Sequence, residues 1–522
     1  MYIDSRSLDD GTVVDSDICI IGAGAAGITL ARELANQPFR IVLIESGGFD
    51  FEDETDGLRR AVNTGRKYPR LPYSRLRYFG GTTNHWGGVC APMRPLAFEH
   101  RPWIPNSGWP ISRQDLDPYY IRAHDVIRLG SFDYDAERTA SAMGMSLFPF
   151  DPSRVETVMS RNNALRFGSH YRRELDEAKN LTTYLWGNVV NINRHPANPY
   201  VTGVSVRTLS GKRFTVRARY FILATGGIEN ARMLLLSRDV EAVGLGNGND
   251  LVGRFFMEHI WYLSGVIMRA GTEDLLQFYD PESFFGDVAV RGHIALPDEL
   301  VRELQIPLFH AEIKARHPSV LNTNAGKSAD AVRESLERWE WPENLGRHLV
   351  NILSGLDDIV GHYAGEKERF PALYLLGNYA EQIPNPDSRI GLVAERDPLG
   401  LNRANVHWQL SDLDKHGIQE AQNVIAAEVG RSGFGRMRIA MPEEEDLLLA
   451  GADGGAHHMG TTRMHHEPRR GVVDADCRIH GLSNVYIAGS SVFPTTGYIN
   501  PTLTIVAMAI RLSDHLKARM NS

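Results

Sequence analysis

The apolar positions nearest the N-terminus follow the order strand, helix, strand. Ile18 to Ile21 is a continuous β-branched run around Cys19. It is too short for a helix and is typical of a central parallel strand that is buried on both faces. Arg40 to Ile44 is predicted to be a second strand. Between them apolar residues recur at helical spacing, at Ile28, Leu30, Ala31 and Leu34. The pattern predicts a βαβ unit.

Three glycines fill the turn between the first strand and the helix. Gly22 allows a tight turn, Gly24 lets the backbone approach a pyrophosphate, and Gly27 lets the helix pack closely on the strand. The helix begins near Ala25, so its free N–H groups point at the phosphates. Glu45 ends the second strand, eighteen residues after Gly27, where a carboxylate can accept both ribose hydroxyls. These features together predict dinucleotide binding, with FAD and NAD both open at this point.

A polar excursion follows Glu45 and carries no hydrophobic periodicity until a second glycine cluster, Gly80 to Gly88. Long loops of this kind in compact enzymes are commonly lids or cofactor covers. Glycines on both sides of Thr83, Asn84 and His85 indicate backbone held close to a flat group that the polar side chains hydrogen-bond. A β-bulge with a stacked tryptophan is the plainer alternative.

The middle of the chain divides by pattern. Residues 101–179 are assigned to a second domain and to linker, with Ser112 and Asp115 predicted to start a helix. Residues 180–254 return to β-rich runs, including a hairpin at Ser210 to Lys212 and an apolar strand that ends at Ala224. Residues 255–437 alternate strand-like and loop segments, which predicts an antiparallel sheet with helices. A helical, charged insert at about 316–369 could be a lid, an oligomer contact or an excursion.

The C-terminal segment places histidines before a buried helix. His457 and His458 open the run HHMGTTRM, and Asn500-Pro501 precedes an apolar stretch from Leu503 to Leu516. Asn suits an N-cap and Pro suits the first helical turn, so a helix is predicted here.

Composition describes an ordinary soluble protein. The 522 residues carry a net charge of −8, which gives no footprint for nucleic acid or anionic membrane. Three widely spaced cysteines suggest neither a disulfide framework nor a metal site. The acidic N-terminus has no apolar signal core and no run of eighteen apolar residues occurs, so we expect a cytoplasmic enzyme.

The GAGAAG loop, Glu45, RYFGGTTNHWGG and HHMGTTRM together resemble the glucose-methanol-choline (GMC) family of FAD oxidoreductases, and the pyranose oxidases and bacterial glycoside 3-oxidases or 3-dehydrogenases within it. The resemblance implies an α/β (α+β overall) fold. An FAD-binding Rossmann-like domain with a central parallel sheet (1–100, 180–254 and 438–522) would join a substrate-binding domain on a largely antiparallel sheet (101–179 and 255–437).

The resemblance also implies roles for individual residues. His457 matches the catalytic histidine and Asn500 its partner, while Arg94 is a candidate for the substrate side or for a plain surface arginine. His465 stands where the family has Gly or Ser. The implied FAD contacts are Gly22, Gly24, Ala25, Gly27, Glu45, Thr83, Asn84, His85, Val189, Ala224, Gly489, Ser490, Asn500 and Thr502.

Attachment and acceptor remain open in this resemblance. His85 matches the position at which some members bond covalently to the flavin, whereas Gly87 lacks the hydroxyl that pyranose oxidases carry there. We expect noncovalent FAD, with covalent attachment through His85 as the alternative. Oxygen and a quinone-type acceptor are both kept, and an oligomer is compatible with the sequence.

Metal binding and core packing are the alternative roles for these histidines. Adjacent histidines point apart and no Cys or carboxylate completes a ligand set, so no metal is expected. A buried histidine that is hydrogen-bonded and has no catalytic role is the alternative for His457. It is the expectation for His458, His465 and His466. The chain lacks the C-x-x-C and second G-x-G-x-x-G of a pyridine-nucleotide disulfide reductase.

The sequence therefore predicts FAD-dependent oxidation of a secondary hydroxyl of a sugar or glycoside, at carbon 2 or carbon 3, to a ketone, with His457 as base. The alternatives are a dye- or quinone-linked dehydrogenase of a non-sugar alcohol, and a redox-silent lyase on the same flavin fold.

Overall fold

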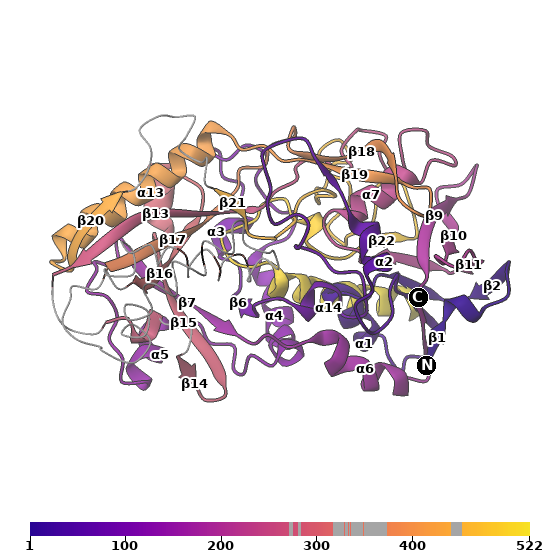
Figure 1. Ribbon diagram of the computed structural model, residues 1–522, viewed down its shortest axis with the longest axis horizontal. Helices are drawn as coiled ribbons and strands as arrows, with labels where there is room; N and C mark the ends of the chain where they lie inside the picture. Colours follow the sequence, from indigo (N-terminus) through magenta and orange to yellow (C-terminus); the bar gives the residue numbers. More distant parts are fainter. Residues whose placement is uncertain are drawn as a thin grey trace.

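The computed structural model describes residues 1–270, 275–279, 283–316, 373–439 and 452–521, and the single residues Ser328, Val332, Ser335 and His348. The molecule is elongated, with a parallel sheet toward one end and a large antiparallel sheet toward the other (Figure 1). Both chain termini lie at the end that holds the parallel sheet (Figure 1).

The parallel sheet has six strands in the order β1-β8-β4-β3-β12-β22, and every neighbouring pair is parallel. The strands β3 and β4 are buried at every position, as their uniformly apolar sequences require. Their bounds, in sheet order, are β1 (Tyr2–Asp4), β8 (Leu181–Leu185), β4 (Ile41–Ile44), β3 (Ile18–Ile21), β12 (Tyr220–Leu223) and β22 (Val485–Ile487).

Four helices pack together beside this sheet. The helix α1 (Ala25–Glu33) contacts α6 (Phe167–Glu177) and the C-terminal α14 (Thr502–Asn521), and α14 also packs on α4 (Arg113–Ile127). The predicted start of α4 is confirmed, because Ser112 and Asp115 form a capping box. Helices α4 and α6 come from the range that the sequence assigned to the substrate-binding domain, yet they pack with α1 and α14.

The second large sheet has nine strands and is antiparallel throughout its described pairings. The predicted antiparallel sheet is therefore confirmed. Its main path is β20 (Gly435–Ile439), β13 (His259–Arg269), β17 (Leu373–Glu381), β16 (Phe309–Arg316), β15 (Val288–Ala295), β7 (Glu156–Asn162) and β6 (Val89–Cys90), with β14 (Phe284–Phe285) on β15 and β21 (Asp453–Gly454) on β13.

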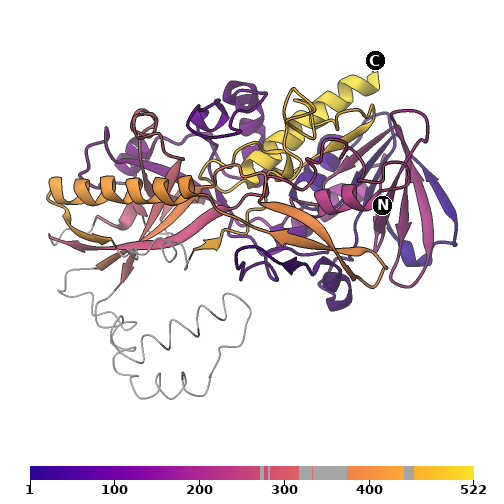
Figure 2. The same cartoon turned by 90° about the horizontal axis from the view of Figure 1, so that it is seen from above.

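One helix runs along this sheet. Figure 2 shows α13 (Asp412–Arg431) beside the strands, and it contacts β13, β17 and β20. Its N-terminus carries a capping box of Ser411 and Asp414.

Two smaller sheets complete the frame. One runs β2 (Thr12–Asp15), β11 (Arg213–Arg217), β10 (Val201–Arg207) and β9 (Asn188–Arg194), and the β10–β11 hairpin confirms the predicted turn at Ser210 to Lys212. The other runs β18 (Arg389–Arg396), β19 (Asn402–His407) and β5 (Val62–Asn63). Because β5 belongs to the polar excursion after Glu45, the excursion is anchored to residues more than 300 positions away.

The remaining helical elements are short. They are α2 (Asp53–Asp56), α3 (Pro95–Phe98), α5 (Ala136–Ala142), α7 (Glu229–Leu236) and α8 (Asp298–Leu304), with 3-10 turns η1 (Ser5–Ser7), η2 (Gly57–Arg59), η3 (Gly81–Asn84), η4 (Gln277–Tyr279) and η6 (Ser490–Val492). The helical insert predicted at about 316–369 lies almost wholly outside the described residues. In the described part of the chain no helix is long and apolar enough to cross a membrane.

Candidate active site and cofactor cradle

The first glycine turn has the close contacts that its sequence predicted. Gly22 has a positive φ of 100°, and a Cβ there would lie 2.7 Å from the Ala224 carbonyl oxygen. At Gly27 a Cβ would lie 1.8 Å from the Gly22 carbonyl oxygen. The turn, the helix α1 and the end of β12 therefore pack too closely for any side chain at these two positions.

Other glycines border open space. A Cβ at Gly24, Gly226 or Gly489 would meet no atom within 4 Å, although Gly489 is itself buried. These glycines follow β3, β12 and β22, whose carboxyl ends meet at one edge of the parallel sheet. Gly24 is also the N-cap of α1 and has no side-chain cap. The cradle therefore fits a dinucleotide, because backbone N–H groups border a space that side chains leave free.

Glu45 shapes the same cradle. Its carboxylate accepts hydrogen bonds from the Ala23 N–H (2.8 Å), the Ser46 hydroxyl (2.9 Å) and the Gly47 N–H (3.2 Å). The side chain is buried at the end of β4, directly beside the glycine turn. A carboxylate has about four acceptor positions, so one remains for a ribose hydroxyl.

The second glycine cluster lies against the first. A Cβ at Gly81 would be 3.1 Å from the Gly24 Cα, and the Gly80 N–H donates to the Ala23 carbonyl oxygen. Thr83 and Asn84 brace this turn through hydrogen bonds to the Gly80 and Phe79 carbonyl oxygens. The two glycine-rich segments, far apart in the sequence, thus form one surface.

His85 is exposed at the end of this turn, and a Cβ at Gly87 would meet nothing within 4 Å. The pKa of His85 lies below its ordinary value of 6.5, because of desolvation and then because of Arg59 and Arg166. An uncharged imidazole bordering free space is the form that could react with, or simply contact, a bound group.

The other candidate cofactor residues occupy the edges of the parallel sheet and its neighbours. Val189 is buried in β9, Ala224 follows β12, Gly489 follows β22, and Thr502 begins α14. The Ser490 hydroxyl donates to the His458 carbonyl oxygen at 2.6 Å. The turn after β22 is thereby attached to the histidine segment.

His457 and Asn500 are brought together across 43 residues of sequence. The Asn500 side-chain amide nitrogen lies 3.1 Å from His457 Nε2. The histidine segment crosses the cofactor turns, since a Cβ at Gly227 would be 2.3 Å from the His458 carbonyl oxygen. The proposed base and its partner therefore stand beside the cradle.

The second nitrogen of His457 has its own partner. His457 Nδ1 lies 2.9 Å from Nδ1 of His259, whose Nε2 is 3.2 Å from the Thr496 carbonyl oxygen. His259, the first residue of β13, was not singled out from the sequence. No local motif marks it, and its only signal is a Glu-His pair directly after the apolar residues Phe255 to Met257.

The site favours uncharged imidazoles. The pKa of His457 lies well below 6.5, because of burial and then because of His259 and His458. The backbone N–H of His457 donates to the Glu258 carboxyl group at 2.8 Å, and burial raises the pKa of Glu258 to about 8. Neutral His457 can accept a proton, which is the requirement for a general base near neutral pH.

His458 points into a different network. Its Nε2 lies 3.1 Å from the Tyr68 hydroxyl and 3.5 Å from Glu258. His465 stays in a local turn, where its Nδ1 accepts from the Glu467 N–H. Neighbouring histidines therefore have different partners, and in the described part of the chain no group of three His, Cys, Asp or Glu side chains is placed to hold a metal ion.

Arg94 is neither a surface arginine nor free to reach outward. It forms ion pairs with Glu156 and with Asp298 (3.0 Å), and donates to the Leu296 carbonyl oxygen at 2.8 Å. Its guanidinium also lies 5.6 Å from the centre of the Tyr498 ring. These contacts tie the start of α3 to β7 and α8.

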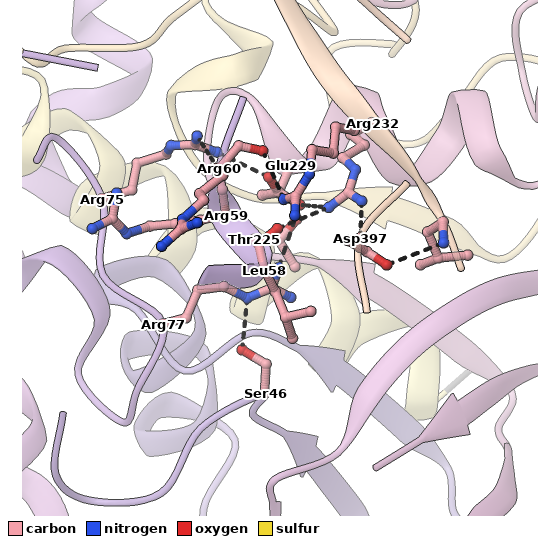
Figure 3. Close-up of polar contacts among 12 residues, drawn as sticks. Ser46, Leu58, Arg59, Arg60, Arg75, Arg77, Thr225, Glu229, Arg232 and Asp397 are labelled. Atoms are coloured by element: carbon pink, nitrogen blue, oxygen red, sulfur yellow. Dashed lines mark hydrogen bonds and ion pairs between the residues drawn. The ribbon is translucent and has the colours of Figure 1, made fainter. Parts of the chain in front are cut away.

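An ionic cluster fastens the polar excursion beside the cradle (Figure 3). Glu229, the first residue of α7, forms ion pairs with Arg75 at 2.9 Å, with Arg232 at 3.1 Å and with Arg77 at 3.8 Å. Arg77 also donates to Ser46 at 3.2 Å, next to Glu45. Burial alone would raise the pKa of Glu229, but these arginines lower it to about 2. The carboxylate is therefore ionised and holds the excursion to α7.

Comparison with protein families identifies the C-terminal part of the chain. Residues 384–509 match the GMC oxidoreductase model. This range contains His457, Asn500 and the strand β22.

Curated relatives align over almost the whole chain. A 6'''-hydroxyparomomycin C oxidase of Streptomyces lividus is 25% identical over 97% of this chain and 92% of its own. The fructose dehydrogenase large subunit of Gluconobacter japonicus is 22% identical over 96% and 97%. A C-glycoside 3-oxidase of Microbacterium trichothecenolyticum is 31% identical, but over only 23% of this chain and 22% of its own.

Solved structures share the fold at low sequence identity. Formate oxidase of Aspergillus oryzae superposes with a TM-score of 0.58 at 16% identity, covering 98% of this chain and 100% of that one. Pyridoxine 4-oxidase of Mesorbium loti gives a TM-score of 0.56 at 16% identity, covering 96% and 99%. The C-terminal part of the chain therefore matches the GMC oxidoreductases, and the relatives that align over almost the whole chain are named as oxidases and dehydrogenases.

Proposed function

We propose that the enzyme oxidises a secondary hydroxyl of a sugar or glycoside, at carbon 2 or carbon 3, to a ketone. His457 is the base, and Asn500 holds the reacting oxygen. The observation that carries this proposal is the approach of the Asn500 amide to His457 Nε2, at 3.1 Å, beside the glycine-lined cradle.

The two side chains divide the work on one hydroxyl group. The neutral Nε2 of His457 accepts the hydroxyl proton, while the Asn500 N–H donates to the same oxygen and does not compete for that proton. The O–H and C–H bonds break as the C=O bond forms. The hydrogen would leave carbon as hydride, with two electrons, and FAD held in the cradle would supply the oxidising capacity to accept it.

The cofactor site uses the cradle. Gly22, Gly24, Ala25 and Gly27 would hold the pyrophosphate, and Glu45 the ribose. Val189 would contact the adenine, Gly489 and Ser490 the ribityl chain, and the glycine cluster with Thr83, Asn84 and His85 the isoalloxazine. We propose noncovalent FAD, with a bond through His85 as the alternative. The domain boundaries given above, a cytoplasmic location and the oligomeric state stay proposals of the sequence.

The substrate class is supported by the relatives. An aminoglycoside-type oxidase, a fructose dehydrogenase and a C-glycoside 3-oxidase are all named after carbohydrate-type substrates. Oxidases and dehydrogenases both occur among them, so oxygen and a quinone-type acceptor are both retained. A non-sugar alcohol is the second candidate, because a 2-methyl-1,2-propanediol dehydrogenase of Mycolicibacterium austroafricanum aligns over 97% of this chain at 21% identity.

An anaerobic titration tests the proposal. The yellow protein is mixed with a panel of sugars, glycosides and simple diols, and flavin bleaching is followed before oxygen or a quinone is admitted. Bleaching by a sugar or glycoside supports the proposal, and bleaching by diols alone favours the second candidate. A flavin that no alcohol in the panel reduces would indicate the redox-silent lyase.

A further inference from the structure

We propose that His259 is a positioning residue that fixes which nitrogen of His457 carries the proton. The proposal rests on the proposed role of His457 as base. Four groups stand in line: the Thr496 carbonyl oxygen, the imidazole of His259, the imidazole of His457 and the amide of Asn500. The contacts along this line are 3.2, 2.9 and 3.1 Å.

The Thr496 carbonyl oxygen determines which ring nitrogen of each histidine carries a hydrogen. A carbonyl oxygen can only accept, so Nε2 of His259 must carry a hydrogen and donate it to Thr496. In a neutral imidazole the other nitrogen is then an acceptor. Nδ1 of His259 is that acceptor, and at 2.9 Å its partner, Nδ1 of His457, must donate.

This arrangement leaves Nε2 of His457, the proposed reacting nitrogen, without a hydrogen. Because His457 carries its hydrogen on Nδ1, its Nε2 has the lone pair, which accepts from the Asn500 amide in this structure. A bound substrate hydroxyl would take the place of the amide at this lone pair, while the amide would donate to the hydroxyl oxygen. Without His259, the two tautomers of His457 would both be populated, and the one protonated on Nε2 cannot accept the hydroxyl proton.

This assignment requires His259 to stay neutral, and its surroundings meet that requirement. The side chain is fully buried, and desolvation lowers its pKa to about 4, against the raising effect of the Thr496 carbonyl. Glu381 lies directly across the sheet from His259 and would favour an imidazolium. However, Arg101 pairs with both Glu381 carboxylate oxygens at 2.6 Å, in a fully buried ion pair.

The other titratable groups that face the two rings do not supply a competing anion. They are Glu258, whose pKa burial raises to about 8, the imidazoles of His458 and His310, and the guanidinium of Arg70, which acts on His457. Arg70 is itself paired with Asp453 at 3.2 Å. A cation on His457 therefore forms only when the substrate delivers its proton.

Proton transfer also benefits from the same contact. When Nε2 of His457 takes the hydroxyl proton, the Nδ1–H of the resulting imidazolium already donates to the lone pair of His259. Charge-assisted hydrogen bonds are stronger than neutral ones, so this contact strengthens as the charge develops.

Three substitutions separate positioning from packing. His259→Leu removes both ring nitrogens, and His259→Gln retains an amide near the Nε2 position but leaves no acceptor at Nδ1. His259→Asn puts an amide oxygen near the Nδ1 position, where it can accept from His457.

In His259→Leu and His259→Gln, flavin reduction at saturating substrate should slow by about 10- to 100-fold, with KM little changed. His259→Asn should restore most of the rate. His124→Gln, which removes another buried imidazole whose hydrogen-bond partners are Gly130 and Tyr134, controls for loss of stability.

A spectroscopic measurement removes the dependence on substrate. In protein labelled with 15N at histidine, with the His457 signals assigned from His457→Ala, the wild type should show a protonated Nδ1 and an unprotonated Nε2. His259→Leu should show an exchange average of both tautomers. If wild-type His457 carries its proton on Nε2, or if His259→Leu keeps the wild-type rate and tautomer, the inference is wrong. If instead His457→Ala reduces its flavin normally, the proposed base fails, and the tautomer measurement alone judges His259.

Discussion

The surroundings of His457 favour its uncharged form. Its side chain has a hydrogen-bond partner on each ring nitrogen, and its backbone N–H is held by Glu258. Desolvation, followed by the neighbouring imidazoles, keeps its pKa low. A low pKa weakens the base in water, but it also keeps the imidazole free of a proton at neutral pH, which is the state in which it can take one from the substrate.

His457→Ala should slow flavin reduction by about 100- to 10,000-fold, the span usual for a general base, while FAD stays bound. Stopped-flow absorbance under anaerobic conditions measures the rate. His458→Ala is the matched control and should cost much less, since its Nε2 contacts Tyr68 and Glu258 instead of Asn500. A wild-type reduction rate in His457→Ala would move the base to another residue.

The pH dependence of flavin reduction follows from the same environment. The rate requires unprotonated His457, whose pKa lies well below 6.5. The reduction rate should therefore stay level as the pH falls through 6.5, and decline only in more acidic buffer. A decline centred at or above 6.5 in the stopped-flow profile would contradict the buried, neutral imidazole.

The sequence predicted His457 and Asn500 because each lies in a recognisable run, and their contact agrees with that interpretation. It did not predict His259, because the pairing of His259 with His457 spans 198 residues and leaves no local pattern. It also left Arg94 open between a surface and a substrate role, whereas the structure engages it in ion pairs. Polar partners that meet through the fold are invisible to periodicity.

The elements around the cradle are those with the clearest sequence patterns. The predicted strand Ile18 to Ile21 is β3, the helix near Ala25 is α1, and the second strand is β4 to within one residue. These elements are local, with uniform burial and glycine turns that only one backbone path satisfies. The antiparallel sheet was predicted in outline, but the addition of β6 and β7 to it was not, because strand pairing is non-local.

Glu45→Ala should weaken FAD binding, because it removes charge-assisted hydrogen bonds that contribute roughly 1.5 to 3 kcal/mol each. The loss of one such bond raises the dissociation constant by at least about tenfold. Fluorescence titration of the apoprotein with FAD measures it. Glu174→Ala, which removes a half-exposed carboxylate paired with Arg32, is the control and should bind FAD as the wild type does. Equal affinity in both variants would remove Glu45 from the site.

Glu229→Gln should destabilise the fold by about 3 kcal/mol, since it leaves buried arginines without their shared carboxylate. The pKa of Glu229 is depressed to about 2 in the folded protein, from 4.5. A depressed pKa contributes stability above about pH 4.5 that is lost as the pH falls toward 2. The difference in unfolding free energy between wild type and Glu229→Gln, measured in urea, should therefore shrink below pH 4.5. A difference that does not change with pH would show that Glu229 is not the ionised centre of the cluster.

At the scale of the whole molecule, the candidate site joins two sheets. The segment that carries His457 begins as β21, paired with β13 of the antiparallel sheet. It then crosses to the parallel sheet, where His458 touches the turns after β12 and β22. His259 comes from the first sheet and the cradle from the second. The reacting groups therefore meet only when both sheets are assembled on each other.

A bound cofactor should then stabilise the molecule as a unit. The proposed FAD contacts come from the turns after β3, β4, β12 and β22 and from the glycine cluster at 80–88, which unfolding would separate. A ligand that binds only the folded state stabilises it by about 4 kcal/mol at a thousand times its dissociation constant.

Acid precipitation should first release yellow FAD into the supernatant, as noncovalent attachment requires. Scanning calorimetry of the apoprotein should then show one transition whose Tm rises with added FAD, and rises less with riboflavin, which lacks the pyrophosphate and adenosine. A yellow pellet after acid would assign a covalent bond, with His85 as its candidate. A Tm that FAD does not change would mean that the cradle does not bind it.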